Sequence, residues 1–209
     1  MTGRVLHPGA DHTESEMQAD VYEGMSQRDI DILERLRARY ATADEMLRAA
    51  VDLKSAGVLG ALVKMGASIG SISKVGRSAL HFAAKRKRLD ACRVLVALGA
   101  DPNYSPPNVW DRPDGVIAVP KGDDYRRTPF EMAVSFGAEE VVSFFVLECG
   151  CSLTARGATG KTPIQLAYAD ESMKALLRSL KSMRIVGDSV PDTADVVEAR
   201  PAQRSLAPL

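Results

Sequence analysis

Residues 78–103, SALHFAAKRKRLDACRVLVALGADPN, contain the two blocks that decide the fold. The first block, SALHFAA at 78–84, joins a polar residue able to cap a helix to small alanines that let two helices approach closely. The second block, LVALGADPN at 95–103, places Gly99 where a helix ends in a left-handed conformation that is costly for other residues. Together the blocks predict two short helices, the second of which ends at a glycine.

The same pattern recurs along the chain at the spacing of a structural repeat. A step of 33 residues back from Gly99 reaches Gly66, which follows the apolar pairs 58–59 and 62–63. Forward of Gly99, TPFEMAV at 128–134 begins a third copy that ends near Gly150, and TPIQLA at 162–167 begins a fourth. Thr followed by Pro is a helix start, because Thr caps the first turn and Pro lacks only an N–H group that would have no partner. Four units in register predict an array in which each unit buries its apolar face against its neighbours.

These blocks resemble the ankyrin repeat, whose pattern is Thr-Pro-Leu-His-x-Ala-Ala, then a second helix, then Gly-Ala-Asp-x-Asn. The resemblance implies an all-α fold, an ankyrin-repeat solenoid of stacked helix-turn-helix units with hairpin loops. It covers about residues 42–183, in units 45–77, 78–127, 128–161 and 162–183. It also implies that His81 ties its helix to the neighbouring hairpin. The first unit departs from the pattern, with EMLR at 45–48 in place of Thr-Pro-Leu-His, and this affects its turn more than its helices.

The two ends of the chain differ in composition from the repeats. Residues 1–25 and 184–209 mix Gly, Pro and charged side chains without periodicity, so we expect disordered tails. Ser26 begins an amphipathic pattern over 26–41, which predicts a helix that caps one end of the stack. The fourth unit, with cations among its apolar positions, would cap the other end. Both tails carry several acidic residues. A further hypothesis is therefore that a tail occupies the concave binding groove that the resemblance implies.

A long insertion interrupts the loop between the second and third repeats. Ser78 and Thr128 are 50 residues apart, 17 more than the normal spacing of about 33. The extra residues lie in 104–127, where four prolines exclude a helix and 116–119 are compatible with a short strand. The resemblance implies an enlarged finger beside the groove, with Trp110 and Tyr125 as partner contacts. The alternative is a solvated insertion whose Trp110 packs back on the repeats.

The resemblance also implies which side chains face the groove, namely those just before each helix start and at the end of each first helix. Most of these residues are cationic, which predicts a basic groove for an acidic protein partner, with Phe136 as an apolar anchor. The alternative is that long basic side chains keep an exposed surface soluble. The residues are Lys74, Arg77, Lys85, Arg86, Arg126, Arg127, Ser135, Phe136 and Lys161.

Composition narrows the class of protein and its location. The 27 Lys and Arg residues balance 27 Asp and Glu residues, so bulk charge gives no preference for nucleic acid or anionic membrane. Three cysteines are too few and too oddly numbered for a secreted disulfide-stapled module, and no apolar stretch reaches the ~20 residues that span a bilayer. We therefore expect a soluble cytoplasmic protein. The basic cluster 85–88 leaves nuclear import as an alternative.

Three features resemble parts of catalytic or metal sites but lack the residues that such sites need. The stretch ARGATGKT at 155–162 fits a relaxed phosphate-loop pattern, but Pro163 removes a donor and no buried strand precedes it. Cys149 and Cys151 have the spacing of half a zinc site without a second pair of ligands. His81 has no partnered nucleophile. We expect no enzyme activity, no cofactor, no metal and no small-molecule substrate.

The sequence thus favours a binding module or adaptor, monomeric by itself, that holds another protein through a basic concave groove and an enlarged loop. A second hypothesis is a stoichiometric inhibitor or regulatory subunit of an enzyme, which would differ in its effect on the partner's activity. A third is a nucleic-acid binder that uses the cationic groove with Trp110 and Tyr125, and it requires a steep salt dependence of binding.

Overall fold

A computed structural model describes residues 21–187 except 23, 54, 106–125 and 158, and in this part of the chain the regular secondary structure is entirely helical. The helices are α2 (Gln27–Arg39), α3 (Ala43–Ala50), α4 (Ala56–Lys64), α5 (Ala79–Lys85), α6 (Leu89–Ala97), α7 (Pro129–Ser135), α8 (Glu139–Leu147), α9 (Pro163–Leu166) and α10 (Glu171–Gly187). None of these helices is long and apolar enough to cross a membrane.

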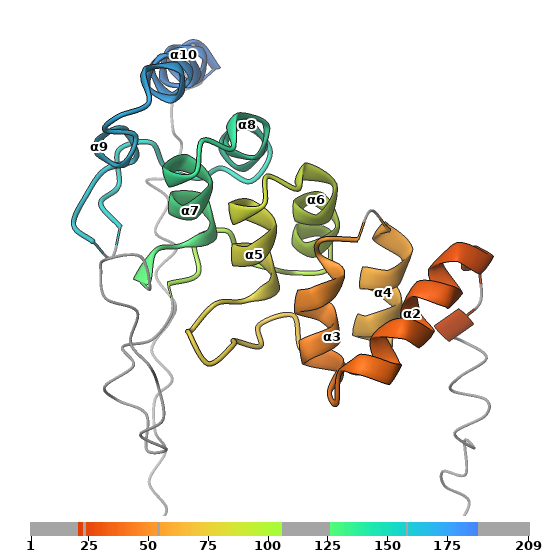
Figure 1. Cartoon of the computed structure of the whole chain (residues 1–209). Coiled ribbons are helices and arrows are strands. Elements are labelled where there is room, and N and C mark those ends of the chain that lie inside the picture. The colour runs from red at the N-terminus through yellow and green to blue at the C-terminus, as the bar shows by residue number, and fades with distance from the viewer. Residues whose placement is uncertain (1–20, 23, 54, 106–125, 158, 188–209) are drawn as a thin grey trace, which may run out of the picture.

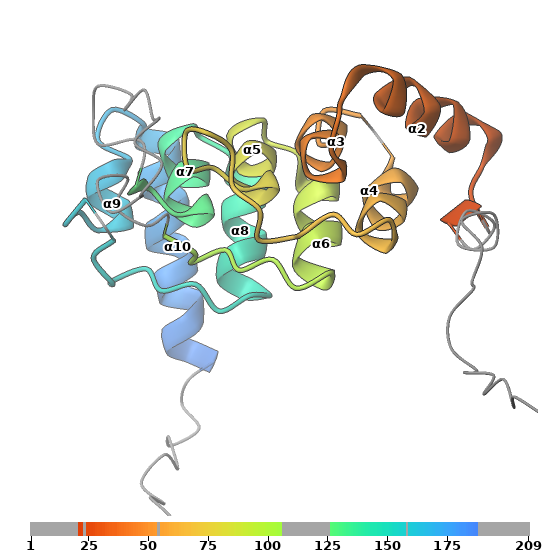
Figure 2. The same cartoon turned by 90° about the horizontal axis from the view of Figure 1, so that it is seen from below.

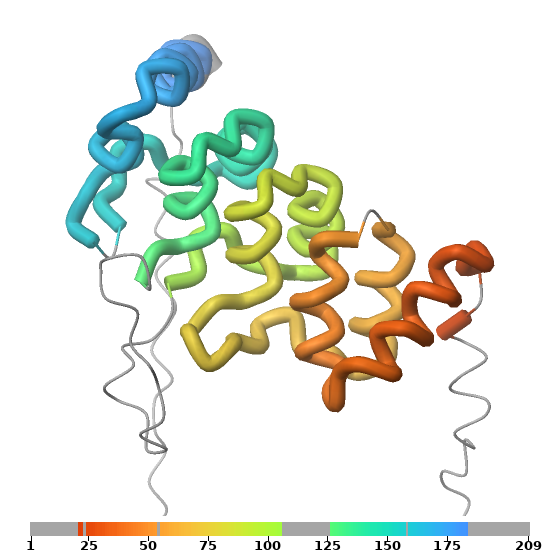
Figure 3. Tube along the Cα trace, in the orientation of Figure 1, coloured from red at the N-terminus to blue at the C-terminus, as the bar shows by residue number. Residues whose placement is uncertain are grey.

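Helices α3 to α10 form four helix pairs that stack side by side (Figure 1). The first helices of the pairs, α3, α5, α7 and α9, lie along one face, and the second helices, α4, α6, α8 and α10, lie along the other (Figure 2). The tube view shows the chain repeating the same path from one pair to the next (Figure 3). The predicted all-α solenoid is confirmed.

Local sequence explains where the helices start and stop. Thr128 Oγ1 accepts a hydrogen bond from Glu131 N at 3.1 Å, and Thr162 N donates to Gln165 Oε1 at 2.9 Å, so both Thr-Pro starts are capped. Gly99 has φ +97°, which favours glycine because it lacks a Cβ. The predicted helix start and stop signals are therefore present at these positions.

The first unit begins earlier than its register predicts. Thr42 caps α3 by accepting from Glu45 N at 3.3 Å, so the helix starts before the EMLR segment rather than at it. The turn between α3 and α4 covers residues 51–55, whereas the matching turn between α5 and α6 covers only 86–88. The longer turn compensates for the earlier start and keeps the second helix in register with Gly66.

Helix α2 packs against the first unit and covers its outer face. Leu33 and Leu36 on α2 are buried, and Asp29 accepts a hydrogen bond from Ser55, the cap residue of α4. Two expected boundaries differ from the structure. Val21, expected in the N-terminal tail, is a buried member of the hydrophobic core, and α10 continues past 183 to Gly187. The helical part of the chain therefore extends beyond the repeat pattern at its C-terminal end.

Candidate functional site

His81 links the second repeat to the residue that precedes the third. Its Nδ1 accepts from the backbone N of Ser78 at 3.1 Å, which leaves the proton on Nε2 to donate to the carbonyl of Arg127 at 3.0 Å. The ring is fully buried, and this burial lowers its pKa to about 4. His81 therefore fixes the backbone at Arg127, on the far side of the insertion, as the resemblance implied.

One cation occupies the same place in each of three units. Arg77, Arg127 and Lys161 directly precede the cap residues of α5, α7 and α9. Arg127 and Lys161 line one open cleft of about 570 Å³, to which residues of the second, third and fourth units contribute. We call it the cationic cleft, and it is lined by Arg127, Arg156, Gly160, Lys161, Gln165, Leu166 and Tyr168. Two predicted site residues thus meet in a single cleft.

Five residues of this cleft were not predicted as site residues, among them Arg156 and Tyr168. Arg156 donates a hydrogen bond from Nη1 to the carbonyl of Gly160 at 2.8 Å. This bond holds the Arg156 guanidinium against the turn that precedes α9. Tyr168 is 84% exposed. A signal for Tyr168 was present in the sequence, because Asp170 caps α10 by accepting from Met173 N at 2.9 Å. Because α10 is capped at Asp170, α9 is short and ends at Leu166, so Tyr168 lies beyond it.

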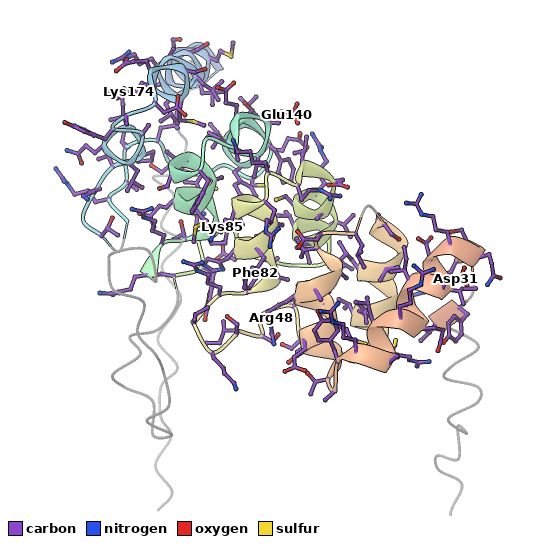
Figure 4. The ribbon with its side chains drawn as sticks, viewed as in Figure 1. Asp31, Arg48, Phe82, Lys85, Glu140 and Lys174 are labelled. Carbon is purple, nitrogen blue, oxygen red and sulfur yellow. The ribbon has the colours of Figure 1, made fainter. Side chains whose placement is uncertain are left out.

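A second predicted group lies further along the first-helix face. The ammonium of Lys85 sits 5.1 Å from the ring centroid of Phe136, a cation–π contact between the second and third units. Figure 4 shows Lys85 with Phe82 of α5 and Arg48 of α3 on this face. Ser135 donates its hydroxyl to the carbonyl of Glu131 at 2.8 Å, within its own helix.

The other predicted residues do not join either group. Arg86 forms an ion pair with Asp52 at 3.5 Å, between the inter-helix turns of the first two units. Lys74 is exposed in the loop before α5. Arg126 lines a neighbouring cleft of about 640 Å³, which shares Arg156 with the cationic cleft. These predicted residues therefore lie in separate local environments, and the basic groove stays a prediction.

Trp110 and Tyr125 lie outside the described residues, as does the expected strand at 116–119. The two flanks of the insertion are described and meet each other. Ser105 donates its hydroxyl to the carbonyl of Arg126 at 3.2 Å, and the ring of Tyr104 contacts His81 edge-on with centroids 6.1 Å apart. The insertion thus leaves and rejoins the repeat stack at one point.

The stretch that resembles a phosphate loop forms a turn that leads into α9. Gly157 N donates to the carbonyl of Lys161 at 3.1 Å, and the helix that follows is the single turn Pro163–Leu166. In the described part of the chain, no group of three or more His, Cys, Asp or Glu side chains is arranged to hold a metal ion.

Comparison with known proteins agrees with this architecture. Residues 46–157 match the model of a family described as ankyrin repeats, three copies. Human neurogenic locus notch homolog protein 1 is 29% identical over 136 residues, 65% of this chain and 5% of that protein. Human neurogenic locus notch homolog protein 2 is 32% identical over 126 residues, 59% of this chain and 4% of that protein. The chain thus matches only about one twentieth of the length of these relatives.

Proposed function

The chain belongs to the ankyrin-repeat family, whose repeats are protein–protein interaction modules, and from this premise we propose that it is a non-enzymatic adaptor for an acidic protein partner. The partner would bind on the face formed by the first helices and the loops before them. The observation that carries the proposal is the cationic cleft, where Arg127, Arg156 and Lys161 come together from two successive units. A stacked array presents such side chains on a preformed surface.

Charge complementarity supports an acidic partner over a neutral one. The cationic cleft is lined by three basic side chains, and no Asp or Glu is among the described residues that line it. A patch of one charge sign speeds association with an oppositely charged partner and rejects like-charged ones. The cleft is therefore the best place on this face for acidic side chains.

The test compares two variants that change the net charge equally. The cleft variant carries Arg127→Gln, Arg156→Gln and Lys161→Gln, and the control carries Arg28→Gln, Lys64→Gln and Lys181→Gln at exposed positions outside the cleft. Each protein is used to capture partners from nuclease-treated lysate of its source cell. A protein captured by the wild type is then purified, and its Kd is measured by titration calorimetry.

We expect the cleft variant to bind at least tenfold more weakly, with the control within about twofold of wild type, and the affinity to fall as salt rises. Equal circular dichroism spectra establish that all three proteins are folded. An unchanged Kd for the cleft variant would refute the proposal. If the partner is an enzyme, its activity at equimolar protein separates an adaptor from a stoichiometric inhibitor.

A further inference from the structure

Tyr168 is exposed because the fourth unit is shortened. Helices α6 and α8 begin 11 residues after Ser78 and Thr128, the cap residues of the first helices of their units, whereas α10 begins 9 residues after Thr162. The residues six positions after the caps are Ala84 and Val134 in the earlier units, and both are buried. The matching residue in the fourth unit is Tyr168, which lies beyond the end of α9 and is 84% exposed. The shortening thus moves an aromatic ring from a core position to the surface.

The exposed ring lies at the edge of the cationic cleft and beside a further cation. Tyr168 lines the cleft, and the ammonium of Lys174 is 5.9 Å from its ring centroid. Figure 4 shows Lys174 at the fourth unit, next to α9. Exposure of a large aromatic ring is unfavourable in isolation, and aromatic residues are enriched where proteins contact one another. The ring is therefore available to a partner at the same place as the cations.

The cationic cleft is open and has a volume of about 570 Å³, which is larger than one carboxylate group. A carboxylate that accepts hydrogen bonds from Arg127 or Arg156 would occupy a small part of this space. The remaining wall includes Leu166 and the ring of Tyr168, which suit an apolar side chain.

We infer that the cationic cleft recognises a peptide segment in which acidic residues adjoin an aromatic residue. The carboxylates bind the guanidinium and ammonium groups of Arg127, Arg156 and Lys161, and the neighbouring aromatic ring packs against Tyr168. This inference rests on the proposed function and specifies which segment of the partner is bound and where. Acidic residues supply the charge, and the ring makes binding more selective than charge alone.

The test uses three synthetic peptides and NMR of the isotope-labelled full chain. The probe is Gly-Ser-Asp-Glu-Phe-Asp-Gly-Ser. One comparison peptide replaces Phe with Ser, and the other replaces the three acidic residues with their amides. We expect the probe to shift the amide signals of residues 156–168, and each comparison peptide to bind at least fivefold more weakly. Binding should weaken as salt rises, because the charged groups are partly exposed.

Substitutions in the protein separate this inference from the proposed function. Tyr168→Ala should raise the Kd of the probe at least fivefold, while Leu147→Ala, at another exposed apolar side chain outside the cleft, should leave it unchanged. Equal affinity of Tyr168→Ala and wild type for the probe, or no preference for Phe over Ser, overturns the inference. In that case a loss of natural-partner binding in the cleft variant would still support the proposed function. Tighter binding of a single-stranded 20-nucleotide DNA than of the probe would also overturn it, since the cleft would then select polyanions by charge alone.

Discussion

At the scale of the residue, His81 makes the stack sensitive to acid. The buried imidazole must stay neutral to accept from Ser78 N and to donate to the Arg127 carbonyl, and burial holds its pKa at about 4, below the ordinary value of 6.5. The unfolded chain therefore binds the proton more readily than the folded one. The stabilisation is complete above pH 6.5 and is lost as the pH falls toward 4, by up to about 3 kcal/mol.

Urea unfolding at several pH values between 7 and 4 checks this expectation. The matched control is His81→Gln, because Gln165 fills the same position of the fourth unit and accepts from Thr162 N at 2.9 Å. The control should be less stable than wild type at pH 7 and should lose less stability between pH 6.5 and 4. Parallel pH profiles for the two proteins would show that His81 is not the source of the acid sensitivity.

Glu131 occupies the position equivalent to His81, and its buried carboxylate lowers the stability of the folded chain. Its Oε2 accepts from Thr128 N at 2.8 Å, but its buried Oε1 packs against Gly157 without a hydrogen-bond partner among the described residues. Burial of a charged carboxylate with one oxygen unpaired is unfavourable, and an amide keeps an acceptor for Thr128 N while it removes the charge. We therefore expect Glu131→Gln to keep the cap and to raise the free energy of unfolding by about 1 kcal/mol.

The measurement is urea unfolding at pH 7, with Gln165→Glu as the control. Gln165 is exposed, so this opposite change should alter stability by less than about 0.5 kcal/mol. A loss of stability in Glu131→Gln would mean that the carboxylate has a favourable interaction that the amide cannot make.

At the scale of the element, α2 stabilises the array by covering the open face of its first unit. Leu33 is fully buried in the middle of this helix, and Asp29 is tied to Ser55 at the start of α4. We expect Leu33→Ala to lower the free energy of unfolding by about 3 kcal/mol, the usual range for a buried Leu being about 2–5 kcal/mol. Arg35→Ala, at an exposed position of the same helix, should change it by less than about 0.5 kcal/mol.

Chemical denaturation with helicity as the signal distinguishes two roles for α2. A single transition that moves to lower urea in Leu33→Ala means that α2 belongs to the cooperative unit. A separate early transition with an unchanged main one would mean that α2 is only an appendage, contrary to our expectation.

The elements also show which parts of the structure could be predicted from sequence. Helix starts at Thr128 and Thr162 and the stop at Gly99 depend on a few adjacent residues, so local chemistry is sufficient to predict them. The first unit was expected from about residue 45, whereas α3 begins at Ala43 and the turn that follows it is longer than in the second unit. Tyr168 was missed because its exposure depends on where α9 ends, and that in turn depends on the cap of the next helix.

At the scale of the whole molecule, the binding surface follows from the repetition of one unit. The positions before the caps recur along the stack, and the resemblance to ankyrin repeats implies that Arg127 and Lys161 face the same groove. In the structure both residues line the cationic cleft. Arg86 does not follow this logic, because its side chain turns to Asp52 at the inter-helix turns. Repetition thus predicts where a side chain is attached to the stack, but its final direction depends on local partners.

Deletion of the insertion shows whether the repeats are stable and bind a partner without it. Ser105 and Arg126 are in hydrogen-bond contact, so two glycines can replace residues 106–125 without moving the helices. Shortening a loop tenfold lowers its closure entropy cost by about 2 kcal/mol, so we expect the deletion variant to unfold in one transition with equal or higher stability. A stability lower by several kcal/mol in urea would instead mean that the insertion, including Trp110, packs on the repeats. If the deletion variant keeps its stability but binds the captured partner more weakly, the insertion contributes to binding. If the variant keeps both its stability and its affinity for the partner, the cationic cleft accounts for recognition without the insertion.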